Sequence, residues 1–157
     1  MRNNIFVLSR ENFKKLLKED MHESKFMKSA FISIHEPGNN FYGAIAKPFP
    51  VILEDSENVL NLWFNDCEEP CPEIEAVLFN EEMANKIVEF VEKNKGATNW
   101  FIHCTMGKCR SGAVGECLSD YFGINYYKFK RDNPQVQPNM LVKKLINNAL
   151  NRDTNEF

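Results

Sequence analysis

The chain has 157 residues, a length that fits one domain able to bury about two-thirds of its unfolded surface. With 43% hydrophobic and 26% charged residues it is an ordinary globular protein, which excludes the disordered and fibrous classes. The net charge of -3 argues against broad electrostatic binding to nucleic acid or to anionic membranes, so we expect neither as a partner.

The first elements are a strand and a helix. The apolar run at residues 5–8 predicts a buried strand, and Ser9 is a candidate N-cap for a helix with Phe13, Leu16 and Leu17 on its inner face. Four apolar residues are too few for a signal peptide or a membrane span, so we expect a cytoplasmic protein.

Two more strands follow before the middle of the chain. The first covers residues 28–36 and stops at Pro37-Gly38, and the second covers residues 59–64. The second strand leads into the polar stretch NDCEEPCPE, in which Pro70 and Pro72 exclude regular structure. We therefore expect a loop between this strand and the next helix.

The clearest helix of the sequence lies at residues 81–95. Asn80 is its candidate N-cap, and Gly96 marks its expected end. The apolar residues of this helix fall on one face: Met83, Ile87, Phe90 and Val91.

Three elements complete the chain. Residues 99–103 predict a fourth strand, residues 110–122 a tightly packed helix that ends at Gly123, and a last helix starts near Pro138-Asn139. The last helix is expected to direct five apolar residues inward: Met140, Leu141, Leu145, Ile146 and Leu150.

Strands that alternate with helices indicate the fold class. We expect a single α/β domain over residues 1–157, with a central, largely parallel sheet and helices on both faces. In such sheets ligands bind beyond the carboxyl ends of the strands, and the turn after residue 103 lies there.

The stretch WFIHCTMGKCRSGAVG carries the strongest chemical signal. It places Cys104 at the end of a strand, Gly107 in the turn and Arg110 at the start of a helix. A turn of this kind directs backbone N–H groups into one concavity, which the positive helix end makes favourable for a tetrahedral anion. The same field favours the thiolate form of a cysteine, and an arginine adds a planar fork for two oxygens. The sequence therefore predicts a phosphate-binding loop with a nucleophile inside it.

These positions form the pattern H-C-x-x-G-x-x-R-S, which resembles the signature of the cysteine-dependent protein tyrosine phosphatases. The resemblance implies that Cys104 attacks phosphorus and forms a phosphocysteine, while Arg110 and the loop amides hold the transferring group. It also implies that Ser111 helps the thiolate to leave and that His103 orients the loop, and it implies no cofactor or metal. The residues expected to bind the phosphate are Thr105, Met106, Gly107, Lys108, Cys109 and Arg110.

A phosphoester also needs a proton for its leaving oxygen, which the resembled family takes from an aspartate on a separate loop. Asp66 fits this role because it follows a strand that runs to the same edge of the sheet. The neighbouring Glu68 and Glu69 and the more distant Asp55 are the competing candidates.

A second, weaker resemblance lies before the last helix. The stretch RDNPQVQPNM is similar to the R-P-x-x-x-P-N segment of dual-specificity phosphatases through Arg131, Pro138 and Asn139, although Pro134 is displaced. Together with the small size it favours a dual-specificity-like catalytic domain that acts on phosphorylated proteins or peptides. Two loop residues leave other substrates open: Lys108 suggests a phosphoinositide, and Thr105 an RNA 5′-phosphate.

Other functions remain open at this stage. Cys104 and Arg110 can be a buried thiol and a solvated cation, or the loop can bind phosphorylated ligands without turnover. An odd number of cysteines, five, favours reduced thiols over a disulfide framework. A zinc site is the remaining alternative, and its candidate ligands are Cys67, Cys71, His103, Cys104 and Cys109.

Overall fold

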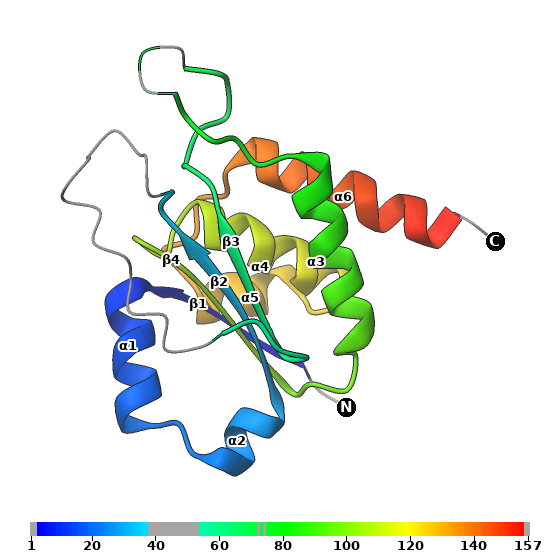
Figure 1. Ribbon diagram of the computed structural model, residues 1–157. Helices are drawn as coiled ribbons and strands as arrows, with labels where there is room; N and C mark the ends of the chain where they lie inside the picture. The colour runs from blue at the N-terminus through cyan, green and yellow to red at the C-terminus, as the bar shows by residue number, and fades with distance from the viewer. Residues whose placement is uncertain (1–2, 38–53, 72, 74, 156–157) are drawn as a thin grey trace.

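The sheet has four strands that all run in the same direction. The computed structural model describes residues 3–37, 54–71, 73 and 75–155, with side chains as far as Asn151 (Figure 1). The strands are β1 (Asn4–Ser9), β2 (Ser29–His35), β3 (Val59–Trp63) and β4 (Asn99–Cys104). They pair in the order β1-β4-β2-β3, and every pairing is parallel. The α/β fold with a parallel sheet that the sequence predicts is confirmed.

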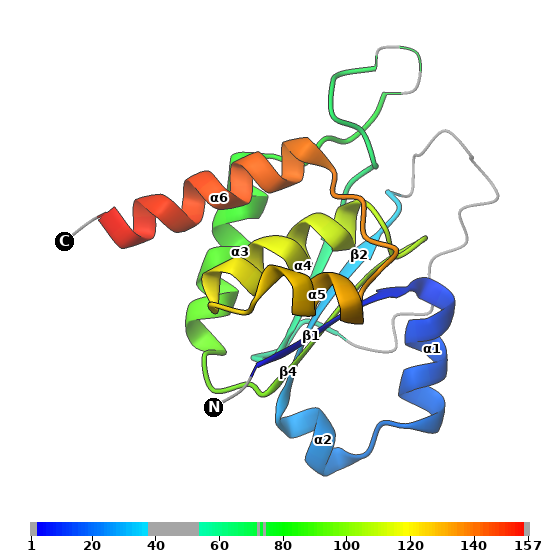
Figure 2. The same cartoon turned by 180° about the vertical axis from the view of Figure 1, so that it is seen from behind.

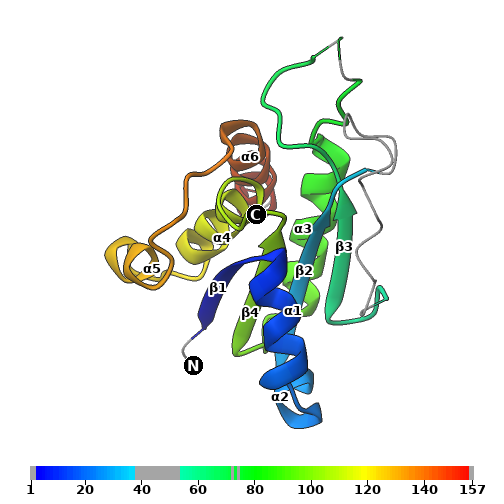
Figure 3. The ribbon, with the colours of Figure 1, turned by 90° about the vertical axis from the view of Figure 1, so that its left-hand side faces the viewer.

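Helices cover both faces of this sheet. They are α1 (Arg10–Glu19), α2 (Glu23–Met27), α3 (Glu81–Lys93), α4 (Arg110–Tyr121), α5 (Tyr126–Asp132) and α6 (Met140–Asn155). Figure 1 shows α1 and α2 apart from the other helices, and Figures 2 and 3 show α5 beside α4 near β1. The prediction of helices on both faces is confirmed.

Each face of the sheet has its own hydrophobic cluster. The larger cluster joins alternate residues of all four strands to α3, α4, α5 and α6, and Trp100 and Ile102 lie at its centre. The smaller cluster, which includes Phe13, Phe31 and Phe101, lies under α1 and α2. The side chains of β4 alternate between these two clusters because successive residues of a strand point to opposite faces.

Two predicted helix starts are confirmed and one predicted helix end is wrong. Ser9 accepts a hydrogen bond from the Asn12 N–H at 3.1 Å, and Asn80 caps α3 in the same way. The helix α3 ends at Lys93, before Gly96, because the Asn94 side chain donates to the carbonyl of Phe90. An asparagine side chain thus supplies the terminal hydrogen bond that the sequence assigned to a glycine turn.

Two helices were not predicted from the sequence, α2 and α5, which have five and seven residues. Such short elements show less than two full turns of hydrophobic periodicity. They are held by their caps, since His22 accepts from the Lys25 N–H and Asn125 from the N–H groups of Tyr127 and Lys128.

Most of the expected inner face of α6 is confirmed, but the prediction that Met140 points inward is wrong. Ile146 and Leu150 are buried and Leu141 and Leu145 are partly buried, whereas Met140 is 55% exposed. Met140 is the first residue of α6, where the helix leaves the core and its backbone N–H turns toward the β3–α3 loop.

The carboxyl ends of the parallel strands meet at one edge of the sheet. The 104–110 loop leaves β4 there, Glu36 follows β2, and the segment after β3 projects beyond the strands beside the start of α6 (Figures 1 and 2). The predicted break of β2 at Pro37 agrees with the structure, while Gly38 and Pro72 lie outside the described residues. No helix in the described part of the chain is long and apolar enough to cross a membrane.

Candidate active site

Cys104 lies at the end of β4 with two polar groups against its sulfur. The residue is 2% exposed, and its Sγ lies 3.0 Å from the Ser111 Oγ at the start of α4. The backbone N–H of Gly107 donates to the same sulfur at 3.3 Å. The predicted strand, turn and helix therefore bring Cys104 and Ser111 together.

The carbonyl groups of the 104–110 loop are held from outside the loop. Those of Thr105, Gly107, Lys108 and Cys109 accept hydrogen bonds from the Arg10 N–H, the Gln135 side chain, the Gln137 N–H and the Asn139 N–H, at 2.9 to 3.2 Å. In a planar trans peptide the N–H points opposite to the carbonyl. The following N–H groups, those of Met106, Lys108, Cys109 and Arg110, are therefore directed toward the concave side, as is the Gly107 N–H that reaches Cys104. This arrangement is a backbone nest at the positive end of α4, a geometry that suits an anion.

Gly107 makes the tight shape of the loop possible. Its φ of +69° lies in the left-handed region that favours glycine. A Cβ atom at this position would overlap the backbone of Leu8 and Ser9 at the end of β1. The glycine of the motif is therefore required both by its backbone conformation and by the close approach of β1.

Arg110 is fixed by partners from two other strand ends. Its Nη1 donates to the carbonyl of Phe64 at 2.8 Å, and its Nη2 donates to Glu36 Oε1. The same Glu36 oxygen accepts from the Thr105 hydroxyl at 2.9 Å. Arg110 is 4% exposed, so this ion pair is shielded from solvent far more than a surface pair. The contacts orient the guanidinium beside the loop, where its remaining N–H groups can meet an anion.

Asp66 lies against the 104–110 loop, whereas Glu68 points to α6. The Asn139 side chain donates to Asp66 Oδ1 at 2.9 Å, and the carboxyl of Asp66 lies near the Cys109 thiol. Glu68 accepts from the Met140 N–H at 2.8 Å and so caps α6. Asp66 is exposed to solvent, which leaves its carboxyl accessible to a bound substrate.

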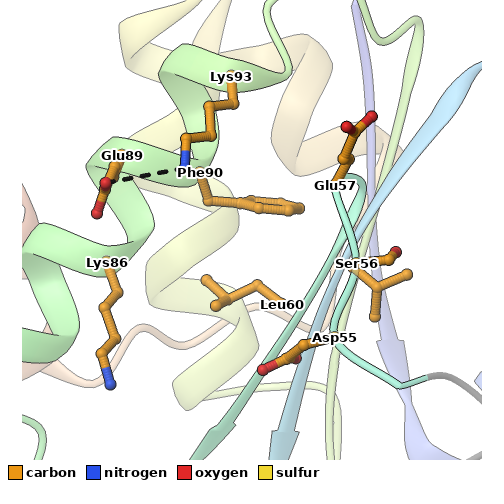
Figure 4. A pocket seen from close by; sticks show the side chains of 9 residues that line it. Asp55, Ser56, Glu57, Leu60, Lys86, Glu89, Phe90 and Lys93 are labelled. Carbon is orange, nitrogen blue, oxygen red and sulfur yellow. Dashed lines mark ion pairs between the residues drawn. The ribbon is translucent and has the colours of Figure 1, made fainter.

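Asp55 lies in a different part of the molecule. Its carboxylate accepts from the backbone and side-chain N–H groups of Asn61, each at 2.8 Å. It lines a hollow of about 660 Å³ between the start of β3 and α3, together with Leu60 and Phe90 (Figure 4). No residue of the 104–110 loop lines this hollow, so the geometry favours Asp66 over Asp55 as the acid.

His103 lies on the other face of the sheet from the Cys104 side chain. Its ring stacks on Phe13 at 4.2 Å and meets His35 edge-on at 5.7 Å. Burial, together with a smaller effect of the nearby His35, lowers the pKa of His103 to about 3. The ring is therefore neutral near pH 7, and any support for the loop comes through packing or hydrogen bonding rather than through charge.

The remaining loop side chains differ in exposure. Met106 and Lys108 are exposed, whereas Cys109 is partly buried. Burial and the neighbouring Asp66 raise the pKa of the Cys109 thiol, so this cysteine stays protonated at neutral pH. These three residues contribute to the loop chiefly through their backbone.

The zinc alternative does not find support in the geometry. Within the described ranges, no three or more His, Cys, Asp or Glu side chains are placed to hold a metal ion. His103 packs on the α1 face, away from the cysteines of the opposite side. The loop instead presents the groups that suit an anion.

Comparison with solved structures places this geometry in a known fold. The chain matches Tk-PTP in its active form, with a TM-score of 0.51 and 14% identity over 97% of this chain and 93% of that one. It also matches PTPMT1 in complex with PI(5)P, with a TM-score of 0.53 and 11% identity over 96% of this chain and 94% of that one. The chain has the fold of the protein tyrosine phosphatases. No family model matches the sequence, and no curated protein matches it either.

Within this fold, three residues that the sequence did not identify as site residues shape the site. Glu36 holds Arg110, Gln135 holds the carbonyl of Gly107, and Asn139 joins Asp66 to the 104–110 loop. Asn139 was noted only as part of a resemblance, and Glu36 and Gln135 stand in no motif. Glu36 directly follows the end of β2 and Asn139 directly precedes α6, whereas Gln135 lies in the middle of the segment between α5 and α6 and carries no local signal.

Proposed function

We propose that this chain is a phosphomonoester hydrolase that works through a phosphocysteine on Cys104, with residues 1–157 as one catalytic domain. The observation that supports this most directly is the position of Cys104 Sγ beside a loop in which four carbonyls are hydrogen-bonded from outside the loop. Such a loop offers N–H groups to the three non-bridging oxygens of a phosphate while the sulfur faces phosphorus. Arg110, held by Glu36, adds a charged fork to the same anion.

The reaction follows from these positions in two steps. The Cys104 thiolate attacks phosphorus, a P–S bond forms, and the P–O bond to the leaving group breaks while Asp66 donates a proton to the departing oxygen. Water then attacks the phosphocysteine, Asp66 takes its proton, and the P–S bond breaks. The Ser111 hydroxyl, 3.0 Å from the sulfur, stabilises the returning thiolate.

The charge around the loop favours a phosphorylated protein or peptide as the substrate. Asp66 lies beside the 104–110 loop on the β3–α3 loop, which also carries the exposed Glu68 and Glu69, and Glu36 lies against Arg110. Carboxylates repel substrates that carry several phosphates and tolerate the single phosphate of a phosphotyrosine or phosphothreonine peptide. A phosphoinositide is the second candidate, since Lys108 is exposed in the loop and PTPMT1, which has the same fold, has been solved with PI(5)P.

Hydrolysis of nitrophenyl phosphate by the full chain tests this function. We expect turnover that EDTA leaves unchanged, inhibition by vanadate, and a radiolabelled phosphoenzyme that is absent in Cys104→Ser. Cys104→Ser should still bind tungstate because the loop amides and Arg110 remain. Tungstate binding without turnover in the wild-type protein would instead identify a recognition module, and a loss of activity restored by zinc or magnesium would overturn the mechanism.

The substrate class is tested separately with phosphotyrosine and phosphothreonine peptides against PI(5)P. We expect higher kcat/KM on the peptides. A preference for PI(5)P would move the assignment to the lipid substrate and leave the chemistry at Cys104 unchanged.

A further inference from the structure

The segment between α5 and α6, residues 133–139, runs along the 104–110 loop, and we call it the strap. Figure 2 shows it rising from α5, past the start of α4, to the first turn of α6. It touches three parts of the molecule that are far apart in sequence: β1, the 104–110 loop and Asp66. These contacts come from different strap residues, so a single substitution can remove one contact and leave the others in place.

Gln135 connects the strap to β1 and to the loop with one amide group. Its Nε2 donates to the carbonyl of Val7 at 2.9 Å and to the carbonyl of Gly107 at 3.1 Å. The contact with Gly107 directs that carbonyl outward and so turns the N–H of Lys108 toward the concave side. Without a donor in this place the peptide loses the partner that fixes its orientation.

Asn139 connects the strap to the acid. Its backbone N–H donates to the carbonyl of Cys109 at 2.9 Å, and its Nδ2 donates to Asp66 Oδ1 at 2.9 Å. Its Oδ1 accepts from the Val142 N–H at 3.1 Å and thereby caps α6. Asn139 itself is 3% exposed, while its bond to the exposed Asp66 is only partly buried. The residue therefore fixes the distance between Asp66 and the loop.

Gln137 provides a natural internal control. Its backbone N–H donates to the carbonyl of Lys108 at 3.0 Å, while the residue itself is exposed. Replacement of its side chain leaves the backbone donor in place. An effect on activity that any side-chain substitution in the strap would cause should therefore also appear when Gln137 is replaced.

We propose that the strap is a positioning element with two separable functions, in which Gln135 orients the anion-binding loop and Asn139 orients the acid Asp66. The proposal rests on the proposed function and deepens it, because it assigns one positioning residue to anion binding and another to proton donation. A residue that supports the loop affects every anion that binds there. A residue that supports the acid affects only reactions that need a proton for the leaving group.

Gln135→Met tests the first function because methionine has a similar length and no N–H donor. We expect the inhibition constant for vanadate to rise by about tenfold, the scale of one lost hydrogen bond. The rates on phenyl phosphate and nitrophenyl phosphate should fall by equal factors. Gln135→Ala, which admits water to the two carbonyls, should show the same pattern with a smaller loss and gives the answer if the methionine variant does not fold.

Asn139→Asp tests the second function because it keeps the oxygen that caps α6 and replaces the donor to Asp66 by an acceptor. We expect phenyl phosphate hydrolysis to slow at least tenfold more than nitrophenyl phosphate hydrolysis, with the vanadate constant within twofold of wild type. The basic limb of its pH–rate profile should also change. Asn139→Leu, which adds no charge, should reproduce the substrate difference.

Gln137→Ala should leave all these quantities unchanged. Equal losses in Gln135→Met and Asn139→Asp on both substrates and on vanadate would overturn the proposal, as would lowered thermal stability with unchanged kinetics. The proposed function fails separately, through a wild-type protein without turnover. In that event the role of Asn139 in orienting an acid is wrong. The role of Gln135 is then tested by whether Gln135→Met weakens the binding of tungstate.

Discussion

The two sides of the candidate active site are built in different ways. The 104–110 loop is anchored to the core, with Cys104 and Arg110 almost fully buried and four carbonyls bonded to neighbouring segments. The opposite side, formed by the β3–α3 loop, is exposed at Asp66 and is attached to the strap by Asn139. We therefore expect anion binding to depend on packed structure and proton donation to depend on the exposed Asp66. Changes in the first region should damage every function of the site, and changes in the second should be selective.

The largest effect is expected from Arg110→Lys, in the buried region. A lysine ammonium cannot donate at once to Phe64, to Glu36 and to two phosphate oxygens. We expect kcat/KM on nitrophenyl phosphate to fall on the order of 100-fold to 1,000-fold. Arg131→Lys, an exposed exchange of the same kind on α5, is the control and should keep full activity. A mild effect of Arg110→Lys would mean that the guanidinium does not touch the transferring group.

A pair of glycine variants separates backbone strain from crowding at the loop. Gly107 and Gly123 both have positive φ, +69° and +73°, so alanine at either position costs about 1 to 2 kcal/mol in strain. Only at Gly107 would the new Cβ meet other atoms, those of the β1 backbone. We expect Gly107→Ala to lose about 100-fold in activity through a displaced loop, and Gly123→Ala to keep its activity. Urea unfolding and nitrophenyl phosphate kinetics measure the two effects.

Asp66→Asn probes the exposed side. The variant should slow phenyl phosphate or phosphotyrosine peptides by about 100-fold and nitrophenyl phosphate much less, because nitrophenolate leaves without a proton. Glu69→Gln, a nearby exposed carboxylate, is the matched control. Equal loss on both substrate kinds would assign Asp66 a structural role, and selective loss in Glu69→Gln would move the acid to Glu69.

The smallest effect concerns stability at the base of the buried side. Burial lowers the pKa of His103 to about 3, below the unfolded value near 6.5, so the unfolded chain binds the proton more readily. The stabilisation that the buried, neutral His103 ring gives to the folded state is present above pH 6.5 and is lost as the pH falls toward 3. We expect it to remove about 2 kcal/mol of unfolding free energy between pH 7 and pH 5. Urea titrations at both values measure it, and His103→Phe, which can still stack on Phe13, should show a weaker pH dependence; an unchanged one would refute this role.

The same two regions explain how much the sequence could predict. The strand, turn and helix around Cys104 were predictable because the glycine, the thiol and the arginine act within a stretch of ten residues. The contacts of Arg110 with Glu36 and of Asn139 with Asp66 join residues more than seventy positions apart. Such pairs depend on which strand ends meet at the edge of the sheet, and a single sequence does not encode that order locally.

Local sequence patterns also failed to predict helix ends and short helices where a side-chain hydrogen bond determines where the helix begins or ends. Asn94 ends α3 before the glycine, and the short helices α2 and α5 depend on caps rather than on a hydrophobic stripe. The long elements were predicted well because burial imposes a clear period on them.

The contacts of the strap with β1 have a consequence for association between chains. β1 is an outer strand, and such strands expose backbone groups that invite a further strand to pair. Here Asn133 bonds the Val7 N–H and the Ile5 carbonyl, and Gln135 bonds the Val7 carbonyl. An incoming strand finds these groups already occupied by amide side chains that copy its hydrogen bonds. The segment that supports the site therefore also blocks edge-to-edge growth of the sheet at β1, which protects the protein against aggregation on that side.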